Sequence, residues 1–150
     1  MRSRYIIVTL VAIAVTATTA YYFANVIQYP AKGTTGVVEI YMTTERWRWD
    51  PKVISGIDAT ASSSPQTGVF ADTTIRVKTG STIVIHITNL DSDTAHGFQI
   101  DEYQVNAFIP PGETITIRFV ADKLGMFIFR CNVLCGVGHP SHVGTLIVGG

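Results

Sequence analysis

Two cysteines and three histidines are the residues of this sequence whose types and spacing could bind a metal ion. Cys131, Cys135, His139 and His142 follow one another at intervals of four, four and three residues, and His96 lies in an earlier segment. Thiolate and imidazole ligands favour copper or zinc and disfavour magnesium or calcium. The pattern therefore predicts a soft or borderline metal site that forms where the two segments meet.

Three other interpretations of these residues remain open. A structural zinc site would use two cysteines and two histidines, but the usual finger places about a dozen residues between the two pairs. A Cys131–Cys135 disulfide is permitted in an oxidising compartment, yet it gives the histidines no role. A catalytic thiol needs a base and a third, orienting group, and near the cysteines only Asn132 is of a suitable type.

Short runs rich in Val, Ile, Thr and Phe surround the candidate ligands and predict β-strands, separated by turn-forming Gly, Pro and Asn residues. Residues 55–68 have no apolar period and are expected to form a surface excursion. Several short strands with such turns favour an all-β sandwich or barrel. The cysteine segment connects the last two strands, and Gly136 and Gly138 let its backbone turn tightly. The expected strands are 37–42, 74–78, 82–88, 114–119, 126–130 and 145–148.

The fourth histidine, His86, is expected to have no part in the metal site. It alternates with Ile83, Ile85 and Ile87 in an expected strand. Because successive side chains of a strand point to opposite faces, His86 should face away from these isoleucines. We therefore predict a surface or edge position for it.

The composition limits the class of protein. Of the 150 residues, 47% are hydrophobic and 15% are charged, with 11 basic and 11 acidic side chains. The balanced charge argues against a nucleic-acid-binding protein, and the hydrophobic content argues against a disordered chain. Two cysteines are too few for a disulfide-dense scaffold. The length allows one domain with a hydrophobic core of its own.

The apolar residues are concentrated near the N-terminus. Residues 5–24 carry no charge and are about as long as the ~20 residues that a helix needs to cross a bilayer. Arg2 and Arg4 precede them, which by the positive-inside rule leaves the N-terminus in the cytoplasm. A cleaved signal peptide is the alternative, but no small-x-small site ends the run. We predict a single transmembrane anchor within residues 1–31 and an extracytoplasmic domain over residues 32–150.

The segment CNVLCGVGHPSH followed by GTLIV, with AHGFQI about 35 residues upstream, resembles the copper A domain of cytochrome c oxidase subunit II. That family's motif runs Cys-x-x-x-Cys-Gly-x-x-His-x-x-Met, with a first histidine in a His-Gly-Phe context. The resemblance extends over the anchor, the Trp47–Trp49 segment and the PPGE turn. It implies an all-β, cupredoxin-like Greek-key barrel or sandwich behind one transmembrane helix, as in the short single-anchor class of haem-copper oxidases.

The resemblance also implies a ligand set for a dinuclear copper A centre. Cys131 and Cys135 would be thiolates that bridge both coppers, and His96 and His139 would each be the terminal imidazole of one copper. The surrounding apolar side chains would limit the access of water to this centre. Those side chains are Phe98, Phe108, Phe127, Phe129 and Leu134.

Two positions depart from the family's pattern. Val133 stands where the family usually has a glutamate whose backbone carbonyl is a weak ligand, and a carbonyl does not depend on the side chain. His142 stands where the family has a weak methionine ligand, and an imidazole is a stronger donor than a thioether. We expect His142 to take the axial position. The alternative is a solvent-exposed His142 that leaves one copper under-ligated.

The resemblance implies an oxidoreductase subunit at a prokaryotic plasma membrane. The chain would pass electrons from a periplasmic donor through copper to the haem-bearing catalytic subunit I, which reduces oxygen. Trp47 matches the tryptophan at which electrons enter. Arg46 and Arg48 replace the family's Gln and Tyr, so that this patch would be basic.

The donor stays open between a cytochrome c and a small blue-copper protein. The candidate docking acids near His96 are Asp91, Asp93, Asp101 and Glu102. The alternative function is a stand-alone anchored cupredoxin that acts as an electron shuttle or a copper chaperone.

Overall fold

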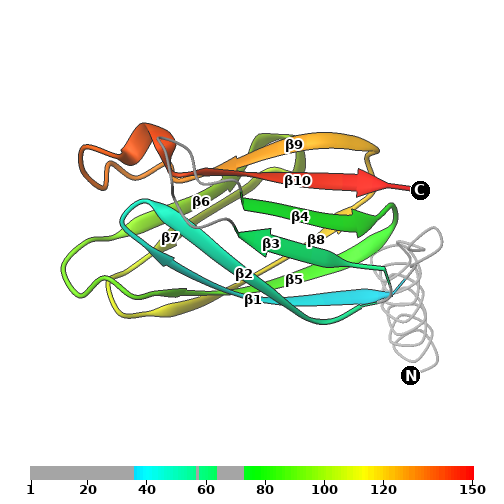
Figure 1. Cartoon of the computed structure of the whole chain (residues 1–150), viewed down its shortest axis with the longest axis horizontal. Helices are drawn as coiled ribbons and strands as arrows, with labels where there is room; N and C mark the ends of the chain where they lie inside the picture. The colour runs from blue at the N-terminus through cyan, green and yellow to red at the C-terminus, as the bar shows by residue number, and fades with distance from the viewer. Residues whose placement is uncertain (1–35, 57, 64–72) are drawn as a thin grey trace, which may run out of the picture. The chain divides into compact units, whose positions relative to one another are not determined.

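Two β-sheets packed face to face form the described part of the chain (Figure 1). The computed structural model describes residues 36–56, 58–63 and 73–150. One sheet has the strand order β2-β1-β5-β8, and the other has the order β3-β4-β10-β9-β6-β7. The strands are β1 Val37–Glu45, β2 Arg48–Ser55, β3 Thr60–Ser63, β4 Thr73–Lys78, β5 Ser81–Asn89, β6 His96–Ile100, β7 Val105–Ile109, β8 Thr114–Ala121, β9 Gly125–Arg130 and β10 Val143–Gly149.

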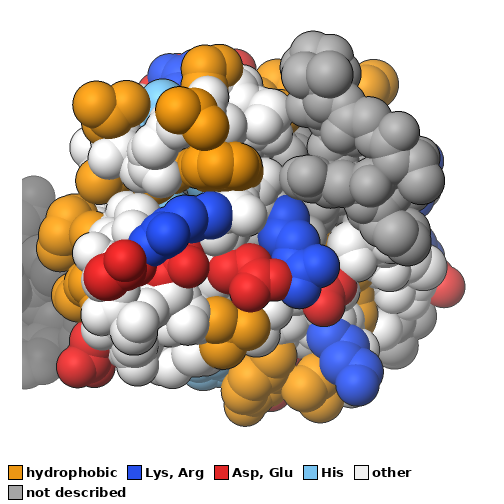
Figure 2. Space-filling model, turned by 60° about the vertical axis from the view of Figure 1, so that its left-hand side comes forward, with side chains coloured by type: hydrophobic (Ala, Val, Ile, Leu, Met, Phe, Trp, Pro, Cys, Tyr) orange, Lys and Arg blue, Asp and Glu red, His pale blue; other side chains and the backbone are white. Residues whose placement is uncertain are grey.

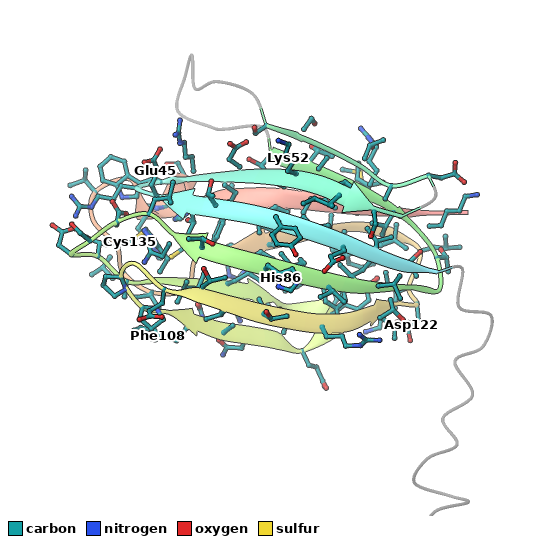
Figure 3. All side chains as sticks on the ribbon, turned by 90° about the horizontal axis from the view of Figure 1, so that it is seen from below. Glu45, Lys52, His86, Phe108, Asp122 and Cys135 are labelled. Atoms are coloured by element: carbon teal, nitrogen blue, oxygen red, sulfur yellow. The ribbon has the colours of Figure 1, made fainter. Side chains whose placement is uncertain are left out.

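A strict alternation of apolar and polar side chains builds the core between the sheets. In β5 the side chains of Ile83, Ile85 and Ile87 are buried, whereas His86 between them is half-buried on the outer face. Burial of each such isoleucine contributes roughly 1.5–3 kcal/mol. The prediction that His86 faces away from the isoleucines is confirmed, and Figure 3 shows it midway along the outer face of the four-stranded sheet.

The predicted all-β sandwich is confirmed, and all six expected strands are present. The prediction of a surface excursion over residues 55–68 is wrong at Thr60–Ser63, which is β3. This strand pairs antiparallel with β4 at the edge of the six-stranded sheet, from Thr60 opposite Arg76 to Ser63 opposite Thr73. Its side chains are mostly exposed, so that backbone hydrogen bonds hold the strand and no apolar period marks it.

The predicted anchor, residues 1–31, lies outside the described residues. Within the described ranges, no helix has both the length and the apolar character that crossing a membrane requires. The helical structure in those ranges consists of two 3₁₀ turns, η1 at Asp101–Tyr103 and η2 at His139–Ser141.

Three connections meet at one end of the sandwich (Figure 1). They are the short turn between β1 and β2, the loop that leads into His96 at the start of β6, and the connection 131–142 between β9 and β10. Figure 3 shows Cys135 and Glu45 at this end and Asp122 at the opposite end. The candidate ligands predicted from the sequence come from only two of these connections. His96 follows the loop before β6, and the others lie in the connection 131–142.

Candidate metal centre

Four of the predicted ligands converge in one buried cluster. The ligand atoms of His96, Cys131, Cys135 and His142 all lie within 4.8 Å of one another. His96 and His142 have no exposed surface, and the two cysteines are 3–4% exposed. Cys131 closes the connection at its base, because its amide donates a hydrogen bond to the carbonyl of His142 over 2.9 Å. His96, which is 35 residues from Cys131 in the sequence, lies beside the sulfur of Cys131.

The two sulfur atoms form the centre of this cluster and are not bonded to each other. Their separation is 3.7 Å, against about 2.05 Å in a disulfide. Both cysteines are free, so the disulfide alternative is not realised in this structure. Nδ1 of His96 lies 3.9 Å from Cys131 Sγ, and Nδ1 of His142 lies 3.8 Å from Cys135 Sγ.

His139 and Val133 lie at the two flanks of the cluster. His139, half-buried in η2, places Nδ1 3.6 Å from Cys135 Sγ, but it is not one of the four mutually close residues. The carbonyl oxygen of Val133 is 3.1 Å from Cys131 Sγ. Cys131 therefore has His96 beside its sulfur, whereas Cys135 has both His139 and His142 beside its sulfur.

The number of donors decides what kind of site these residues fit. Three histidine Nδ1 atoms and one carbonyl oxygen lie around the two cysteine sulfurs, which makes six possible donors in all. A structural zinc ion takes four ligands in a tetrahedron, two fewer than this set offers. Thiolate and imidazole are ligands that copper favours. The donor set therefore fits a soft metal ion such as copper.

The charge state of the two thiols differs. Burial raises the pKa of Cys131, but the hydrogen bonds around its sulfur, including the one from the Gly97 amide, outweigh burial and lower this pKa to about 4. Burial and the adjacent Cys131 thiolate raise the pKa of Cys135 to about 12. The pair therefore loses its protons in two well-separated steps. The groups around Cys131 therefore favour its thiolate, the form that binds metal.

His96 is held from its far side by a carboxylate. Its Nε2 lies 2.8 Å from Oδ2 of Asp91, in the loop between β5 and β6. Burial lowers the pKa of His96, but hydrogen bonds with Cys131 and Asp91 raise it by more. The Gly97 amide next to it donates to Cys131 Sγ over 3.3 Å. Asp91 therefore orients the ring so that Nδ1 faces the sulfur.

His142 is fully buried, which excludes the exposed alternative for this residue. Its Nε2 is 3.0 Å from Oγ1 of Thr44 and 3.2 Å from the carbonyl oxygen of Arg48. The Trp49 ring stacks on the imidazole, with the ring centroids 4.1 Å apart. Burial lowers the pKa of His142, which keeps the ring neutral, as a metal ligand must be. Sequence reasoning did not find Thr44, because its partner lies 98 residues away.

Trp47 packs directly onto the cysteine loop. Its indole N–H donates to the carbonyl of Cys135 over 3.1 Å, and the side chain is half-buried. Gly136 has φ +116°, so the predicted tight turn is confirmed there. Gly138 has an ordinary φ of −90°, and its lack of a side chain serves a different purpose. A Cβ at Gly138 would overlap the indole of Trp47.

The predicted basic patch around Trp47 is wrong. Arg46 pairs with Asp93 and lies 3.7 Å from Asp91, and Arg48 pairs with Glu45. Figure 2, in which this end of the sandwich comes forward, shows positive and negative side chains alternating in a band. The acidic partners lie far from Arg46 in sequence, 47 residues away for Asp93, which the local pattern does not reveal.

The apolar residues expected around the site divide into two groups. Phe98 and Phe129 are fully buried, stack with their centroids 5.3 Å apart, and contact Trp49 edge-on, while Phe127 is half-buried. Phe108 and Leu134 are 59% and 83% exposed, so the prediction that they shield the site is wrong. Phe108 lies on the outward face of an edge strand, and Leu134 lies on the exposed side of the loop.

Leu134 forms part of an exposed apolar surface beside the site. Together with Trp47 and Val137 it lines a hollow of about 600 Å³, and Val137 is 91% exposed. Arg46, Asp93 and Cys135 border the same hollow. We call Trp47, Leu134 and Val137 the apolar rim.

The family model of the cupredoxin-like domain matches residues 59–148, which is more than half of the chain. The chain belongs to the cupredoxin-like family. Cytochrome c oxidase subunit 2 of Thermus thermophilus is 36% identical over 74 residues, which are 49% of this chain and 53% of that protein. Nitrous-oxide reductase of Cupriavidus necator is 36% identical over 96 residues, 63% of this chain and 15% of the reductase. This cupredoxin-like chain therefore spans about half or less of these relatives.

Solved structures have the same cupredoxin-like fold. The periplasmic domain of subunit II of cytochrome oxidase from Bradyrhizobium japonicum superposes with a TM-score of 0.58 at 24% identity, covering 74% of this chain and 83% of that one. A chain of a haem-copper terminal oxidase dimer superposes with a TM-score of 0.56 at 18% identity, covering 98% of each. The relatives named cytochrome c oxidase subunit 2 confirm the resemblance to oxidase subunit II that the motifs predicted.

Proposed function

We propose that this chain is the electron-transfer subunit II of a haem-copper terminal oxidase and that it holds a dinuclear copper A centre. The observation that carries the proposal is the buried cluster of His96, Cys131, Cys135 and His142, in which the two sulfurs are not bonded to each other. The carbonyl of Val133 and Nδ1 of His139 lie beside this cluster. The relatives named cytochrome c oxidase subunit 2 support it independently. The residues proposed to hold copper are His96, Cys131, Val133 through its carbonyl, Cys135, His139 and His142.

The protein contributes a rigid and dry frame for these ligands. A copper pair held by these residues would supply one-electron chemistry. Asp91 orients His96, and the amide of Cys131 ties the ends of the ligand loop together. Trp49, Phe98 and Phe129 exclude water from the inner side. Ligands that are held in place before and after electron transfer need little rearrangement, which favours a fast transfer.

Trp47 is the proposed point of electron entry. It is the aromatic ring that joins the solvent-facing hollow to the ligand loop, through its hydrogen bond to the Cys135 carbonyl. No other tryptophan of the chain is available for this, because Trp49 is 1% exposed and lies inside the core.

The proposed electron donor is a weakly charged cytochrome c or small blue-copper protein that docks on the apolar rim. Leu134 and Val137 are the exposed apolar side chains there. The neighbouring arginines are each paired with a carboxylate, so this face offers little net charge to steer a strongly basic or acidic donor. The donor's encounter rate should therefore depend only weakly on salt.

The remaining assignments follow from the sequence. Residues 1–31 would carry a single-pass anchor with a cytoplasmic N-terminus, and residues 32–150 an extracytoplasmic domain at a prokaryotic plasma membrane. Electrons would leave toward a haem-bearing catalytic subunit I. A subunit should come out of detergent together with a multi-span haem protein, whereas a stand-alone shuttle or chaperone should come out alone.

The decisive experiment is metal analysis of the purified full-length chain loaded with copper. Two coppers per chain that share one unpaired electron in the electron paramagnetic resonance spectrum would support the proposal. One tightly bound zinc, with no uptake of copper, would overturn it. Loading with zinc alone is the control that distinguishes a selective copper site from a general thiol site.

A further inference from the structure

Thr44 is a buried side chain outside the predicted ligand set, yet it touches one member of that set. Its hydroxyl oxygen lies 3.0 Å from Nε2 of His142, and the residue is 1% exposed. It comes from β1 in the four-stranded sheet, whereas His142 directly precedes β10 in the six-stranded sheet. The contact therefore joins the two sheets at the metal centre.

The hydrogen-bond directions around His142 can be derived from the atoms involved. The carbonyl oxygen of Arg48 only accepts, and it lies 3.2 Å from Nε2 of His142. Nε2 must therefore carry a proton. The Thr44 hydroxyl donates to the same carbonyl over 3.2 Å, which leaves its lone pairs to accept from Nε2–H. With these directions, Nε2 of His142, the Thr44 hydroxyl and the Arg48 carbonyl oxygen all have a hydrogen-bond partner.

This arrangement determines which ring nitrogen of His142 is free. A neutral imidazole carries one ring proton, and here that proton is on Nε2. Nδ1 then presents its lone pair, and Nδ1 is the atom that lies 3.8 Å from Cys135 Sγ. The Trp49 ring, stacked on the imidazole at 29°, fixes the plane of the ring.

The position of the Thr44 hydroxyl is itself well defined. Thr44 pairs with Trp49 of β2 on one side and with Asn89 of β5 on the other, and its carbonyl accepts from the amide of Leu90 over 2.8 Å. A β-branched side chain on such a backbone has few alternative rotamers. The hydroxyl is thus held by the sheet and not by the ligand loop.

We propose that Thr44, with the backbone carbonyl of Arg48, is a positioning residue that locks His142 in its Nε2–H tautomer and makes Nδ1 its copper-binding atom. The inference rests on the proposed function, in that His142 is taken as a copper ligand. It adds a second-sphere residue that neither the motif nor the ligand spacing contains. Second-sphere partners of metal-bound histidines fix the tautomer and the ring orientation in this way.

The first test needs no metal and no substitution of Thr44. Nitrogen NMR of the metal-free full-length chain, labelled with ¹⁵N-histidine, reports the tautomer of each ring, and His142→Met identifies the His142 signals by their loss. We expect one Nε2–H tautomer for His142. A protonated Nδ1, or a mixture of the two tautomers, would overturn the proposal.

The second test compares Thr44→Val with Thr44→Ser in the copper-loaded chain. Valine keeps the shape but removes the hydroxyl, so copper binding should weaken about 10-fold or more and the copper hyperfine pattern should change. Serine restores the hydroxyl and should restore both. The matched control is Thr79→Val, which removes a hydroxyl-to-carbonyl bond to Gly149 at the other end of the sandwich. Equal melting-point losses in both valine variants, with unchanged spectra, would reduce Thr44 to a structural role and overturn the proposal.

The third test asks whether Thr44 acts through His142. In a His142→Met background, Thr44→Val should leave the copper spectrum and affinity unchanged, because the histidine that it orients is gone. An undiminished effect there would overturn the proposal. If the wild-type chain takes up no copper, the proposed function fails, and the NMR tautomer of His142 still decides whether the lock exists.

Discussion

The two sides of the sulfur pair hold their histidines with different chemistry. On the Cys131 side, His96 is backed by the carboxylate of Asp91. On the Cys135 side, His142 is backed by a hydroxyl and a carbonyl, both neutral. A carboxylate partner makes an imidazole a stronger donor than a neutral partner does. The same residue type is thus held by different partners on the two sides of the sulfur pair.

The difference also lies in where each support comes from. Asp91 is five residues from His96 and belongs to the same loop. Thr44 and Arg48 are more than 90 residues from His142 and belong to the other sheet. One side of the centre is therefore assembled locally, whereas the other side depends on the correct packing of the sandwich.

Removing a sulfur should have the largest effect, because both sides depend on the pair. Cys131→Ser and Cys135→Ser should each abolish the two-copper signal, measured as copper per chain and by electron paramagnetic resonance. Val133→Ala is the matched control, since it keeps the backbone carbonyl and should keep both coppers. A two-copper spectrum in either serine variant would contradict the assignment of the sulfurs as shared ligands.

Replacing the carboxylate should make the two sides more alike. Asp91→Asn leaves His96 with a neutral partner, so we expect copper affinity to fall about 10- to 100-fold. Competition with a copper chelator measures this change. Asp93→Asn is the control, because Asp93 pairs with the same Arg46 but does not contact His96 in the described structure. Equal losses in the two variants would show that the ion pair with Arg46, and not the support of His96, is what matters.

Adding a side chain at Gly138 should disturb the packing of the ligand loop on the Cys135 side and lower the free energy of unfolding. In Gly138→Ala the new methyl group overlaps the Trp47 indole, and such overpacking costs about 1–3 kcal/mol of unfolding free energy. Urea unfolding followed by tryptophan fluorescence measures the cost. The control is Gly149→Ala, where a Cβ meets no atom within 4 Å. Similar midpoints for the two variants would mean that Trp47 does not pack on the loop as described.

The smallest effect is expected at the surface. Leu134→Ser should slow electron uptake from a weakly charged cytochrome c by a few-fold, corresponding to roughly 1 kcal/mol, because it removes an apolar contact from the rim. Stopped-flow spectroscopy at low and high ionic strength measures the rate. The control is Ile54→Ser, which removes an exposed apolar side chain of β2 that does not line the hollow. A steep fall of the wild-type rate with salt would contradict docking on a charge-compensated face.

Local patterns in the sequence were sufficient for the fold class and for three of the four residues that converge in the cluster. The period of two along β5 and β10 predicts a sandwich, and the spacing of Cys131, Cys135 and His142 places all three within one connection. These signals are local, since they depend on residues a few positions apart.

The features that sequence reasoning missed depend on contacts between distant segments. β3 has no apolar pattern because it pairs at an edge, and the charge of Arg46 is compensated by Asp93 from another loop. The support of His142 by Thr44 requires knowing which positions of the two sheets face each other. No window along the chain contains that information.

The contact between Thr44 and His142 has a consequence for the kinetics of the site. Its two partners belong to opposite sheets, so the ligand loop cannot move away from the four-stranded sheet without breaking the hydrogen bonds of His142. A metal bound between His142 and the cysteines would strengthen this link between the two sheets. We therefore expect copper to dissociate at the rate at which the two sheets separate locally at this end. The lifetime of the bound metal would then report how often that local opening occurs.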